Sequence, residues 1–312
     1  MEYKTKCLII GSGVAGCTAG IYTARANLQP ILICGEFGGQ LATTDDVENY
    51  PGFESIKGGE LTEKMLKQAE KCGTKIMMDY LNSVNLSSKP FTAKSNSNTY
   101  IADTIIIATG AKAKWLGIES ETKYKGHGVS ACAVCDGNFY RNKIVAVVGG
   151  GNSAFTEALY LSTIAKKVYL VHRNTNFKAE KVLINKLFET KNIEILSNNV
   201  INEIIGAEDA LGKYVTGIDL QNTSNGNIQH IDLDGVFVAI GHTPCTELFK
   251  DQLELTNNGY IKTNPITKET SVKNVFACGD VQDEFYKQAI VACGSACVCA
   301  LEVERRMMNL GK

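Results

Sequence analysis

The feature that most constrains this chain is a glycine-rich turn that occurs twice, each time between an apolar strand and a helix. The first, GSGVAG, spans 11–16 after the apolar run 6–10, and the second, GGGNSA, spans 149–154 after 144–148. Small residues at this spacing permit a tight turn and let a pyrophosphate approach the first amides of the helix. The chain therefore predicts two dinucleotide-binding units.

The sequence after the two turns is also repeated. A helical pattern follows each turn (14–27 and 153–164), and a second apolar strand follows each helix (29–34 and 167–172). Each copy then has a polar stretch with strand patterning (82–100 and 198–232) and closes with an apolar strand (104–110 and 235–241). Two copies of one βαβ-based architecture are predicted.

The C-terminal tail is too short to be a third domain. It returns to a strand at 275–280 and a helix at 288–308, which we expect to complete the first copy. The predicted fold class is therefore α/β, with two Rossmann-like three-layer domains, one inserted into the other. We expect the outer domain to comprise 1–115 and 246–312 and the inserted domain 116–245, with a hinge where the chain crosses twice.

Charge and hydrophobicity exclude several classes of partner. The 312 residues carry 32 basic and 33 acidic side chains and no basic run, which argues against nucleic acid. The longest apolar stretch, 289–301, is shorter than the ~20 residues that span a bilayer. The N-terminus has no signal-peptide pattern, so we expect no membrane association and a cytoplasmic location, with most of the 11 cysteines reduced.

The end of the second strand in each copy indicates which dinucleotide binds. In the inserted domain this strand ends at His172-Arg173, with Lys178 nearby, where an acid would otherwise bind a ribose 2′-hydroxyl. Basic groups favour a 2′-phosphate, so NADPH is predicted over NADH. The other domain is then expected to hold the hydride acceptor, most economically FAD, with its ribose bound by Glu36 or by loop backbone.

A Cys-x-x-Cys motif, Cys132 to Cys135, directly precedes the second nucleotide-binding strand. Thiols at this spacing can form a reducible disulfide, and the adjacent Asp136 can donate or accept a proton. Zinc and a purely structural pair are the alternatives, but the four histidines do not complete a zinc-binding spacing. Cys293, Cys297 and Cys299 are interpreted as core thiols.

Taken together, these motifs resemble the low-molecular-weight thioredoxin reductases over essentially the whole chain. The stretches that carry the resemblance are 38–41, 47–52, 108–111, 132–137, 149–154, 239–244, 279–281 and 287–289. The resemblance implies FAD in the outer domain, NADPH and a redox disulfide in the inserted domain, a homodimer, and thioredoxin as the substrate. It also implies that Cys135 meets the flavin, that Cys132 attacks thioredoxin, and that Asp136 is the acid.

The predicted binding residues follow from the glycine motifs and the resemblance. For FAD they are Gly11, Ser12, Gly13, Ala15, Gly16, Glu36, Gly39, Gln40, Leu41, Asn49, Ala108, Thr109, Gly110, Gly279, Asp280, Lys287, Gln288 and Ala289. For NADPH they are Gly149, Gly151, Asn152, Ser153, His172, Arg173, Lys178, Ile240 and Gly241. No metal ligands are predicted.

Two departures from the family pattern bear on these sites. Asn174 and Lys178 stand where the family usually has arginines, which should relax the preference for a 2′-phosphate. Lys287 also replaces a common arginine. The cysteine pair argues against the related ferredoxin or flavodoxin reductases, and the start at Met1 argues against flavoproteins with an extra N-terminal redox domain. A redox sensor without turnover is the remaining alternative.

Overall fold

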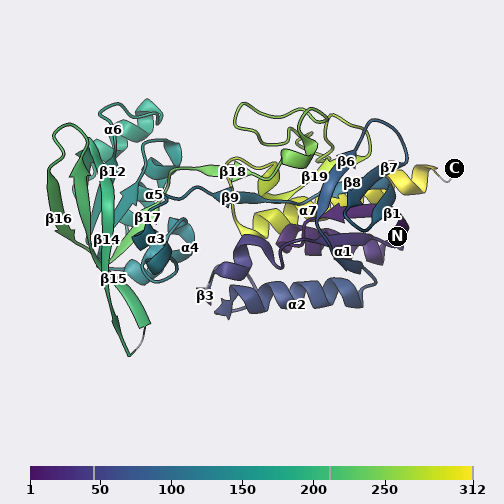
Figure 1. The fold of residues 1–312 in the computed structure, drawn as a ribbon, viewed down its shortest axis with the longest axis horizontal. Helices are drawn as coiled ribbons and strands as arrows, with labels where there is room; N and C mark the ends of the chain where they lie inside the picture. Colours follow the sequence, from purple (N-terminus) through teal and green to yellow (C-terminus); the bar gives the residue numbers. More distant parts are fainter. Residues whose placement is uncertain (45, 211, 311–312) are drawn as a thin grey trace. The chain divides into compact units, whose positions relative to one another are not determined.

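The computed structural model describes residues 1–44, 46–210 and 212–310; for residues 309 and 310 it describes the backbone alone. The chain divides into two compact units (Figure 1). The outer unit consists of Met1–Lys112 and Thr243–Lys312, and the inserted unit consists of Ala113–His242.

The outer unit is built on a mainly parallel sheet with strand order β5-β2-β1-β8-β7-β6, in which β19 also pairs with β8. Its elements are β1 (Glu2–Ile10), α1 (Val14–Arg25), β2 (Ile31–Cys34), η1 (Gly39–Thr43), β3 (Asp46–Val47), β4 (Ile56–Lys57), α2 (Gly58–Lys71), β5 (Lys75–Met78), β6 (Leu81–Asn85), β7 (Phe91–Ser95), β8 (Thr99–Ile107), β9 (Ala111–Ala113), β18 (His242–Pro244), η3 (Glu247–Phe249), β19 (Val275–Ala277), η4 (Gly279–Val281) and α7 (Ala289–Leu310).

Side chains of the central strands point alternately to the two faces of the sheet, so the sheet lies between two apolar cores. Ile9 faces the core formed with α1, α2 and α7, whereas Leu8 and Ile10 face the core formed with the β6–β8 meander. The long strand β8 serves both structures, because its first half pairs antiparallel with β7 and its second half pairs parallel with β19. The C-terminal segment thus completes the N-terminal sheet, as the sequence predicted.

The inserted unit repeats this plan on a parallel sheet of order β10-β17-β11-β12-β13. Its elements are α3 (Glu119–Tyr124), β10 (Val129–Ser130), α4 (Ala133–Asp136), η2 (Gly137–Tyr140), β11 (Ile144–Val148), α5 (Asn152–Ser162), β12 (Lys167–His172), α6 (Lys181–Glu189), β13 (Ile193–Ser197), β14 (Asn199–Asp209), β15 (Gly212–Asn222), β16 (Ile228–Asp232) and β17 (Gly235–Val238).

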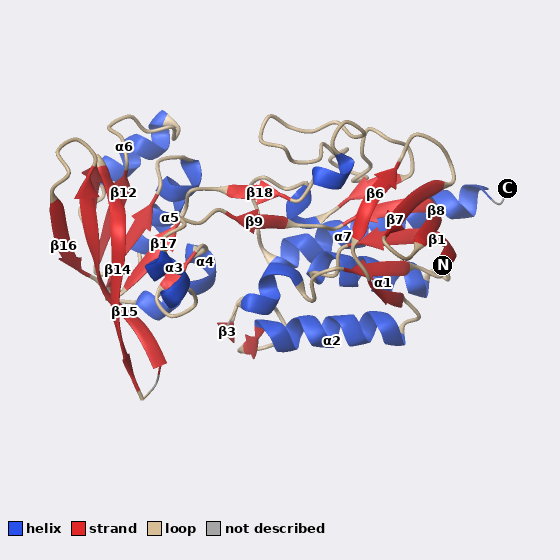
Figure 2. Ribbon diagram, in the orientation of Figure 1, coloured by secondary structure: helices blue, strands red, loops and turns tan. Residues whose placement is uncertain are grey.

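Its two sheet faces are covered by different structures. Val145 and Val147 of β11 pack with α5 and α6, whereas Ala146 and Val148 pack with the antiparallel sheet β14-β15-β16. Figure 2 distinguishes the helices from the strands in both units. Each unit therefore has helices on one face of a parallel sheet and an antiparallel meander on the other, which confirms the prediction of two Rossmann-like domains.

The two connections between the units differ in position from the predicted boundaries. The units divide after Lys112 and after His242, three residues before the expected ends at 115 and 245. Both connections are extended and pair with one another as the two-stranded sheet β9-β18. An extended chain that continues through a boundary leaves no break in the sequence pattern, so the offset was not visible there. Within the described residues, no helix is both long and apolar enough to cross a membrane.

Candidate active site

The glycine-rich loop of the outer unit has the geometry that a dinucleotide requires. Gly11 has φ +110°, and a Cβ there would lie 2.3 Å from the carbonyl oxygen of Ala108. A Cβ on Gly16 would lie 1.8 Å from the oxygen of Gly11, so helix and strand pack through this glycine. By contrast, a Cβ on Gly13 would have no neighbour nearer than Gly38, at 4.0 Å. The second glycine is therefore open to a ligand, as the pyrophosphate motif requires.

The first turn of α1 adds electrostatic support. Gly13 is its N-cap, and within the described residues no side chain caps the helix and no acid lies in its first turn. Ser12 instead donates a hydrogen bond from Oγ to the Glu36 carbonyl, at 2.8 Å, which ties the loop to the end of β2. The free amides and the helix dipole suit an anionic phosphate. These residues therefore fit a flavin dinucleotide.

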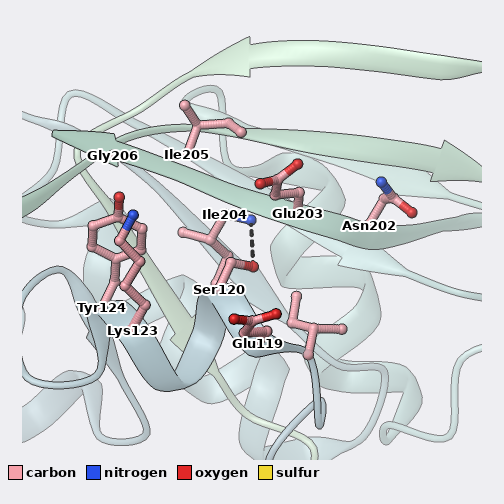
Figure 3. A pocket seen from close by; sticks show the side chains of 10 residues that line it. Glu119, Ser120, Lys123, Tyr124, Asn202, Glu203, Ile204, Ile205 and Gly206 are labelled. Carbon is pink, nitrogen blue, oxygen red and sulfur yellow. Dashed lines mark hydrogen bonds between the residues drawn. The ribbon is translucent and has the colours of Figure 1, made fainter.

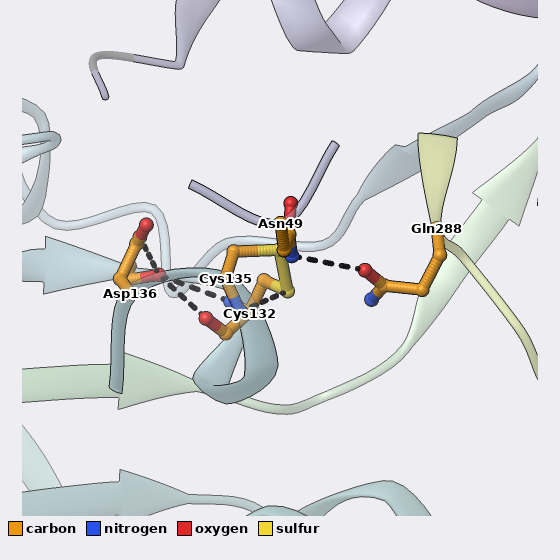
Figure 4. The surroundings of a disulfide bond; sticks show 6 residues. Asn49, Cys132, Cys135, Asp136 and Gln288 are labelled. Carbon is orange, nitrogen blue, oxygen red and sulfur yellow. Dashed lines mark hydrogen bonds between the residues drawn. A yellow bond between two sulfur atoms is a disulfide. The ribbon is translucent and has the colours of Figure 1, made fainter. Parts of the chain in front are cut away.

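Several predicted FAD residues from distant parts of the sequence meet around this loop. A Cβ on Gly39 would lie 3.4 Å from Gly13, and a Cβ on Gly279 would lie 3.0 Å from Cβ of Ala15. Asn49 donates from Nδ2 to Oε1 of Gln288 at 3.3 Å, as Figure 4 shows. Others lie in the elements that these contacts join: Gln40 and Leu41 in η1, Asp280 in η4, and Ala289 at the start of α7.

The end of β8 forms another wall of this site. Thr109 donates from Oγ1 to the carbonyl of Cys245 at 2.7 Å, and the Cys245 amide donates to Gly110. Ala108, below Gly11, is buried. The two parts of the outer unit are thus joined directly beside the glycine-rich loop.

Charged groups in the outer site have shifted pKa values. Burial raises the pKa of Asp280 to about 6, and the nearby Lys287 ammonium partly opposes this rise. Burial also lowers the pKa of Lys287, whose Nζ donates to the carbonyl of Asp283 at 2.7 Å. Glu36, the predicted ribose ligand, is paired with Lys112 at 3.4 Å. Lys112 was not predicted, because nothing in its sequence surroundings marks it.

The glycine-rich loop of the inserted unit has the same close and open glycine positions as the outer loop, but alanine replaces the third glycine of the motif. A Cβ on Gly149 would lie 2.5 Å from the carbonyl oxygen of Ala239, whereas a Cβ on Gly151 would meet nothing within 4 Å. The third position is the fully buried Ala154. Gly151 caps α5, and the described residues provide neither a side-chain cap nor an acid in its first turn. This loop fits the pyrophosphate of a nicotinamide dinucleotide.

The segment after β12 folds back over this loop. The Lys178 amide donates to the carbonyl of Gly150 at 2.7 Å, and a Cβ on Gly150 would lie 2.1 Å from the ring of His172. Asn152 donates to Oε1 of Glu180 at 3.1 Å and accepts from the Glu180 amide at 2.8 Å. Part of the hydrogen-bonding capacity of Asn152 is therefore used internally, by an acid that was not predicted.

The remaining predicted NADPH residues lie near the same edge of the sheet. The side chains of Arg173 and Lys178 are exposed, as is that of Ser153 in the first turn of α5. Ile240 is partly exposed after β17, and Gly241 has φ +101°. Exposed cations beside an open phosphate loop are consistent with recognition of a 2′-phosphate.

Cys132 and Cys135 form a disulfide, with the two Cα atoms 5.3 Å apart (Figure 4). Cys132 is the N-cap of α4, and its Sγ accepts the amide of Cys135 at 3.2 Å. The Ser130 hydroxyl donates to Oδ2 of Asp136 at 2.5 Å and accepts the Cys132 amide at 3.0 Å. Val134 and Phe139, beside the pair, are about half exposed.

The Ser130 hydroxyl thus joins the Asp136 carboxylate to the backbone amide of Cys132, beside the reducible bond. The contribution of Ser130 was not predicted, because it depends on the turn that brings β10 beside α4. The two sulfurs bond to each other instead of to zinc, and the described part of the chain contains no cluster of three or more potential metal ligands. Cys293, Cys297 and Cys299 are free thiols.

A separate cavity of about 470 Å³ lies elsewhere in the inserted unit, between α3 and β14. Figure 3 shows Ser120 and Lys123 of α3 beside Glu203 and Ile204 of β14. The Ile204 amide donates to Oγ of Ser120 at 2.9 Å. None of the predicted site residues lines this cavity.

Comparison with known proteins agrees with this geometry. The sequence profile of the family described as "Pyridine nucleotide-disulphide oxidoreductase" matches residues 5–296. The thioredoxin reductase of Rickettsia conorii is 52% identical over 98% of this chain and 99% of its own length, and that of Escherichia coli O157:H7 is 50% identical over 98% and 97%. The structure of thioredoxin reductase from Giardia duodenalis is 42% identical, with a TM-score of 0.93 over 98% of this chain and 99% of its own. This chain therefore belongs to the pyridine nucleotide-disulphide oxidoreductases, within the family of thioredoxin reductases.

Proposed function

We propose that this chain uses NADPH to reduce the disulfide of a thioredoxin, by way of FAD and the Cys132–Cys135 pair. It is an FAD-dependent oxidoreductase, and FAD and NADPH are its cofactors. The observation that carries the proposal is the Cys132–Cys135 disulfide itself, next to a carboxylate held by Ser130. A nucleotide-binding chain without such a pair could not exchange disulfides with a protein substrate.

The two cysteines have different roles in the proposed reaction. Bound FAD would supply the chemistry that carries two electrons from the NADPH hydride to the disulfide and opens it. The Cys132 thiolate attacks one sulfur of the thioredoxin disulfide, which forms a mixed disulfide and releases one thioredoxin thiolate. The Cys135 thiolate then attacks Sγ of Cys132, so the internal disulfide closes again and the second thioredoxin thiolate leaves.

Asp136 is proposed to supply a proton in this sequence. The two departing thiolates take up two protons in total; the Asp136 carboxyl, next to Cys135 in the chain, can deliver one of them, and solvent supplies the other. Ser130 orients the carboxyl because its hydroxyl donates to Oδ2. The exposed side chains Val134 and Phe139 provide an apolar surface beside the pair for a protein substrate.

We infer that the inserted unit rotates during turnover. The NADPH loop and the disulfide both belong to this unit, so they must alternate at a cofactor held by the other unit. The crystal structure of Lactococcus lactis thioredoxin reductase, 33% identical to this chain, is described as the FR conformation of that protein. An engineered disulfide between the two connections should stop turnover, and undiminished turnover would contradict the rotation.

A homodimer in the cytoplasm completes the proposal. It is supported by the resemblance to the family alone and is tested by the mass of the flavin-loaded protein in analytical ultracentrifugation, which should be twice 33.8 kDa. Fractionation of the source cells would test the location.

The decisive experiment is an anaerobic titration of the flavin-loaded protein with NADPH, followed by the flavin spectrum. Flavin alone accepts one equivalent, and flavin plus the disulfide accepts two. We expect two equivalents for the wild type and one for Cys135→Ser. One equivalent in the wild type would show that the pair is not coupled to the flavin and would favour a ferredoxin-type reductase or a sensor. Oxidation of NADPH on adding thioredoxin then tests the substrate.

A further inference from the structure

The segment that carries the predicted 2′-phosphate cations lies against the glycine-rich loop of the inserted unit. This segment, 173–180, joins β12 to α6, and we term it the strap. The Lys178 amide donates to the Gly150 carbonyl at 2.7 Å, so the backbone of the strap is bonded directly to the loop. The side chains of Arg173 and Lys178 are exposed. The strap therefore determines where two exposed cations lie relative to the phosphate loop.

An aromatic side chain secures the middle of the strap. The ring of Phe177 packs edge-on against that of Phe155, with centroids 5.1 Å apart, and its centroid lies 5.2 Å from that of His172. The carbonyl of Asn176 lies 3.2 Å from Nε2 of His172. These contacts fix the strap to the body of the inserted unit, but none of them uses a polar group of the glycine-rich loop.

A side-chain pair joins the end of the strap to the start of α5. Glu180 accepts a hydrogen bond at Oε1 from Nδ2 of Asn152 at 3.1 Å, and its amide donates to Oδ1 of Asn152 at 2.8 Å. Asn152 is the first residue of α5 and directly follows Gly151, the open glycine of the loop. Glu180 stands two residues after Lys178. The pair therefore links the phosphate end of the helix to the segment that carries the cations.

A carboxylate is an unexpected group at this position. Glu180 is exposed, and a negative charge beside a site for phosphate groups repels them. It is also the N-cap residue of α6, but within the described residues its side chain makes no capping hydrogen bond to that helix. The side chain is directed to Asn152 instead. Its contribution is therefore to the geometry of the loop and the strap, and not to the stability of α6.

This geometry matters because the two phosphate groups of the coenzyme belong to one molecule. The pyrophosphate and the 2′-phosphate are joined through one ribose, so a cation meets the 2′-phosphate only if it lies at the matching distance from the phosphate loop. Lysine makes this requirement stricter, because its ammonium is a point charge on a flexible stem. A strap that is bonded to Asn152 fixes the start of the Lys178 stem in advance, which reduces the entropy lost on binding.

We propose that Glu180 is a positioning residue for coenzyme selection, which by bonding to Asn152 keeps Lys178 where it can meet the 2′-phosphate. The inference rests on the proposed function, in which NADPH is the coenzyme. The role belongs to the acceptor oxygen of the side chain, whereas its charge weakens the binding of every dinucleotide. Glutamine should therefore preserve the selection, and alanine should not.

The test is the affinity of the oxidised, flavin-loaded protein for NADP⁺ and for NAD⁺, measured by isothermal titration calorimetry without thioredoxin. The readout is the ratio of the two dissociation constants, because a general loss of structure weakens both nucleotides alike and leaves the ratio unchanged. We expect the wild type to bind NADP⁺ more tightly. Equal affinities in the wild type would contradict the coenzyme of the proposed function, and the inference with it.

We expect Glu180→Ala to reduce the preference for NADP⁺ about three- to tenfold, because the released strap no longer positions Lys178. Glu180→Gln should keep the preference within about twofold of the wild type, with both nucleotides bound slightly more tightly. Glu189→Ala removes the same charge from an exposed position at the end of α6 and is the matched control, with the preference unchanged. Thermal unfolding confirms that each variant is folded.

Two outcomes would overturn the inference while leaving the proposed function intact. An unchanged preference in Glu180→Ala, in a protein whose wild type selects NADP⁺, would show that the strap is positioned without this carboxyl group. A loss of preference in Glu180→Gln as large as that in Glu180→Ala would show that the charge acts instead of the acceptor oxygen.

Discussion

The two glycine-rich loops share a turn but differ in the origin of the residues around them. The outer loop is enclosed by segments from the whole chain: Ser12 bonds to Glu36, Gly11 packs on Ala108, and Ala15 meets Gly279. The inserted loop is covered by 176–180, which follows it by fewer than 30 residues and leaves Arg173 and Lys178 exposed. The first arrangement suits a cofactor that stays bound, and the second suits a coenzyme that must leave after each hydride transfer.

The largest test of this contrast compares glycines of the two loops. Gly16→Ala places a methyl group within 1.8 Å of the Gly11 carbonyl, so we expect a loss of about 3 kcal/mol in the free energy of unfolding and loss of bound flavin. Gly151→Ala meets nothing within 4 Å and should change stability by less than about 0.5 kcal/mol while weakening NADPH binding. Urea unfolding and flavin content measure both effects. Similar losses of stability in the two variants would contradict the difference between the loops.

A smaller effect should appear in the pH dependence of stability of the flavin-free protein. The pKa of Asp280 is raised to about 6 in the folded state, so the folded protein retains this proton over a range where the unfolded chain has lost it. Stability contributed at low pH is therefore lost as the pH rises from about 4 to about 6. Asp280→Asn should remove this part of the decline, and should stabilise the protein at pH 7 by roughly 2–3 kcal/mol.

Urea unfolding of the wild type and of Asp280→Asn at several pH values measures this difference. The two proteins should have nearly equal stability at pH 4. A constant difference at all pH values would contradict the assignment to this carboxyl. Glu157, with a pKa of about 7, should make an analogous contribution in the inserted unit.

The inserted loop can be tested through its exposed cation. Arg173→Gln should raise KM for NADPH about tenfold, the equivalent of about 1.4 kcal/mol, and leave KM for NADH and the flavin content unchanged. Arg141→Gln, at another exposed position in the same unit, is the control. An equal rise in KM for both coenzymes would show that Arg173 does not read the 2′-phosphate.

The smallest effect is expected at the rim of the outer loop. Lys112 and Glu36 form an ion pair with both side chains largely exposed, and such pairs contribute little. Lys112→Met should change the dissociation constant of FAD by less than threefold. A tenfold weakening, measured by flavin fluorescence, would instead place this ammonium in contact with the cofactor.

The sequence predicted the elements that carry the loops better than it predicted the partners of individual side chains. The strand at 167–172 has the predicted ends, and α1 begins at the predicted Val14, because apolar runs and glycines determine these elements locally. The reducible pair was likewise visible as a motif. The hydrogen bonds that Ser130 makes with Asp136 and with the Cys132 amide were not, because they depend on the packing of α4 beside β10.

The charged partners of the loop residues could not be predicted either, because they too depend on contacts between separate segments. Glu180 reaches Asn152, and Lys112 reaches Glu36, across turns whose geometry no local pattern specifies. The unit boundaries lie three residues before the predicted ones, because β9 and β18 continue through them as extended strands whose amino-acid composition does not differ from that of their surroundings. Positions of chain segments were therefore predictable where periodicity determines them, and side-chain contacts between segments were not.

The late position of β19 and α7 has a consequence for synthesis on the ribosome. Residues 1–112 emerge first, but the second half of β8 is paired on one edge only, with β1, until β19 is made, and α1 packs against α2 but lacks α7. The inserted unit is contiguous and emerges whole in between. The nascent chain therefore leaves one edge of β8 and the apolar side of α1 that faces α7 uncovered while some 130 residues are translated, which makes this early segment the natural client of a chaperone.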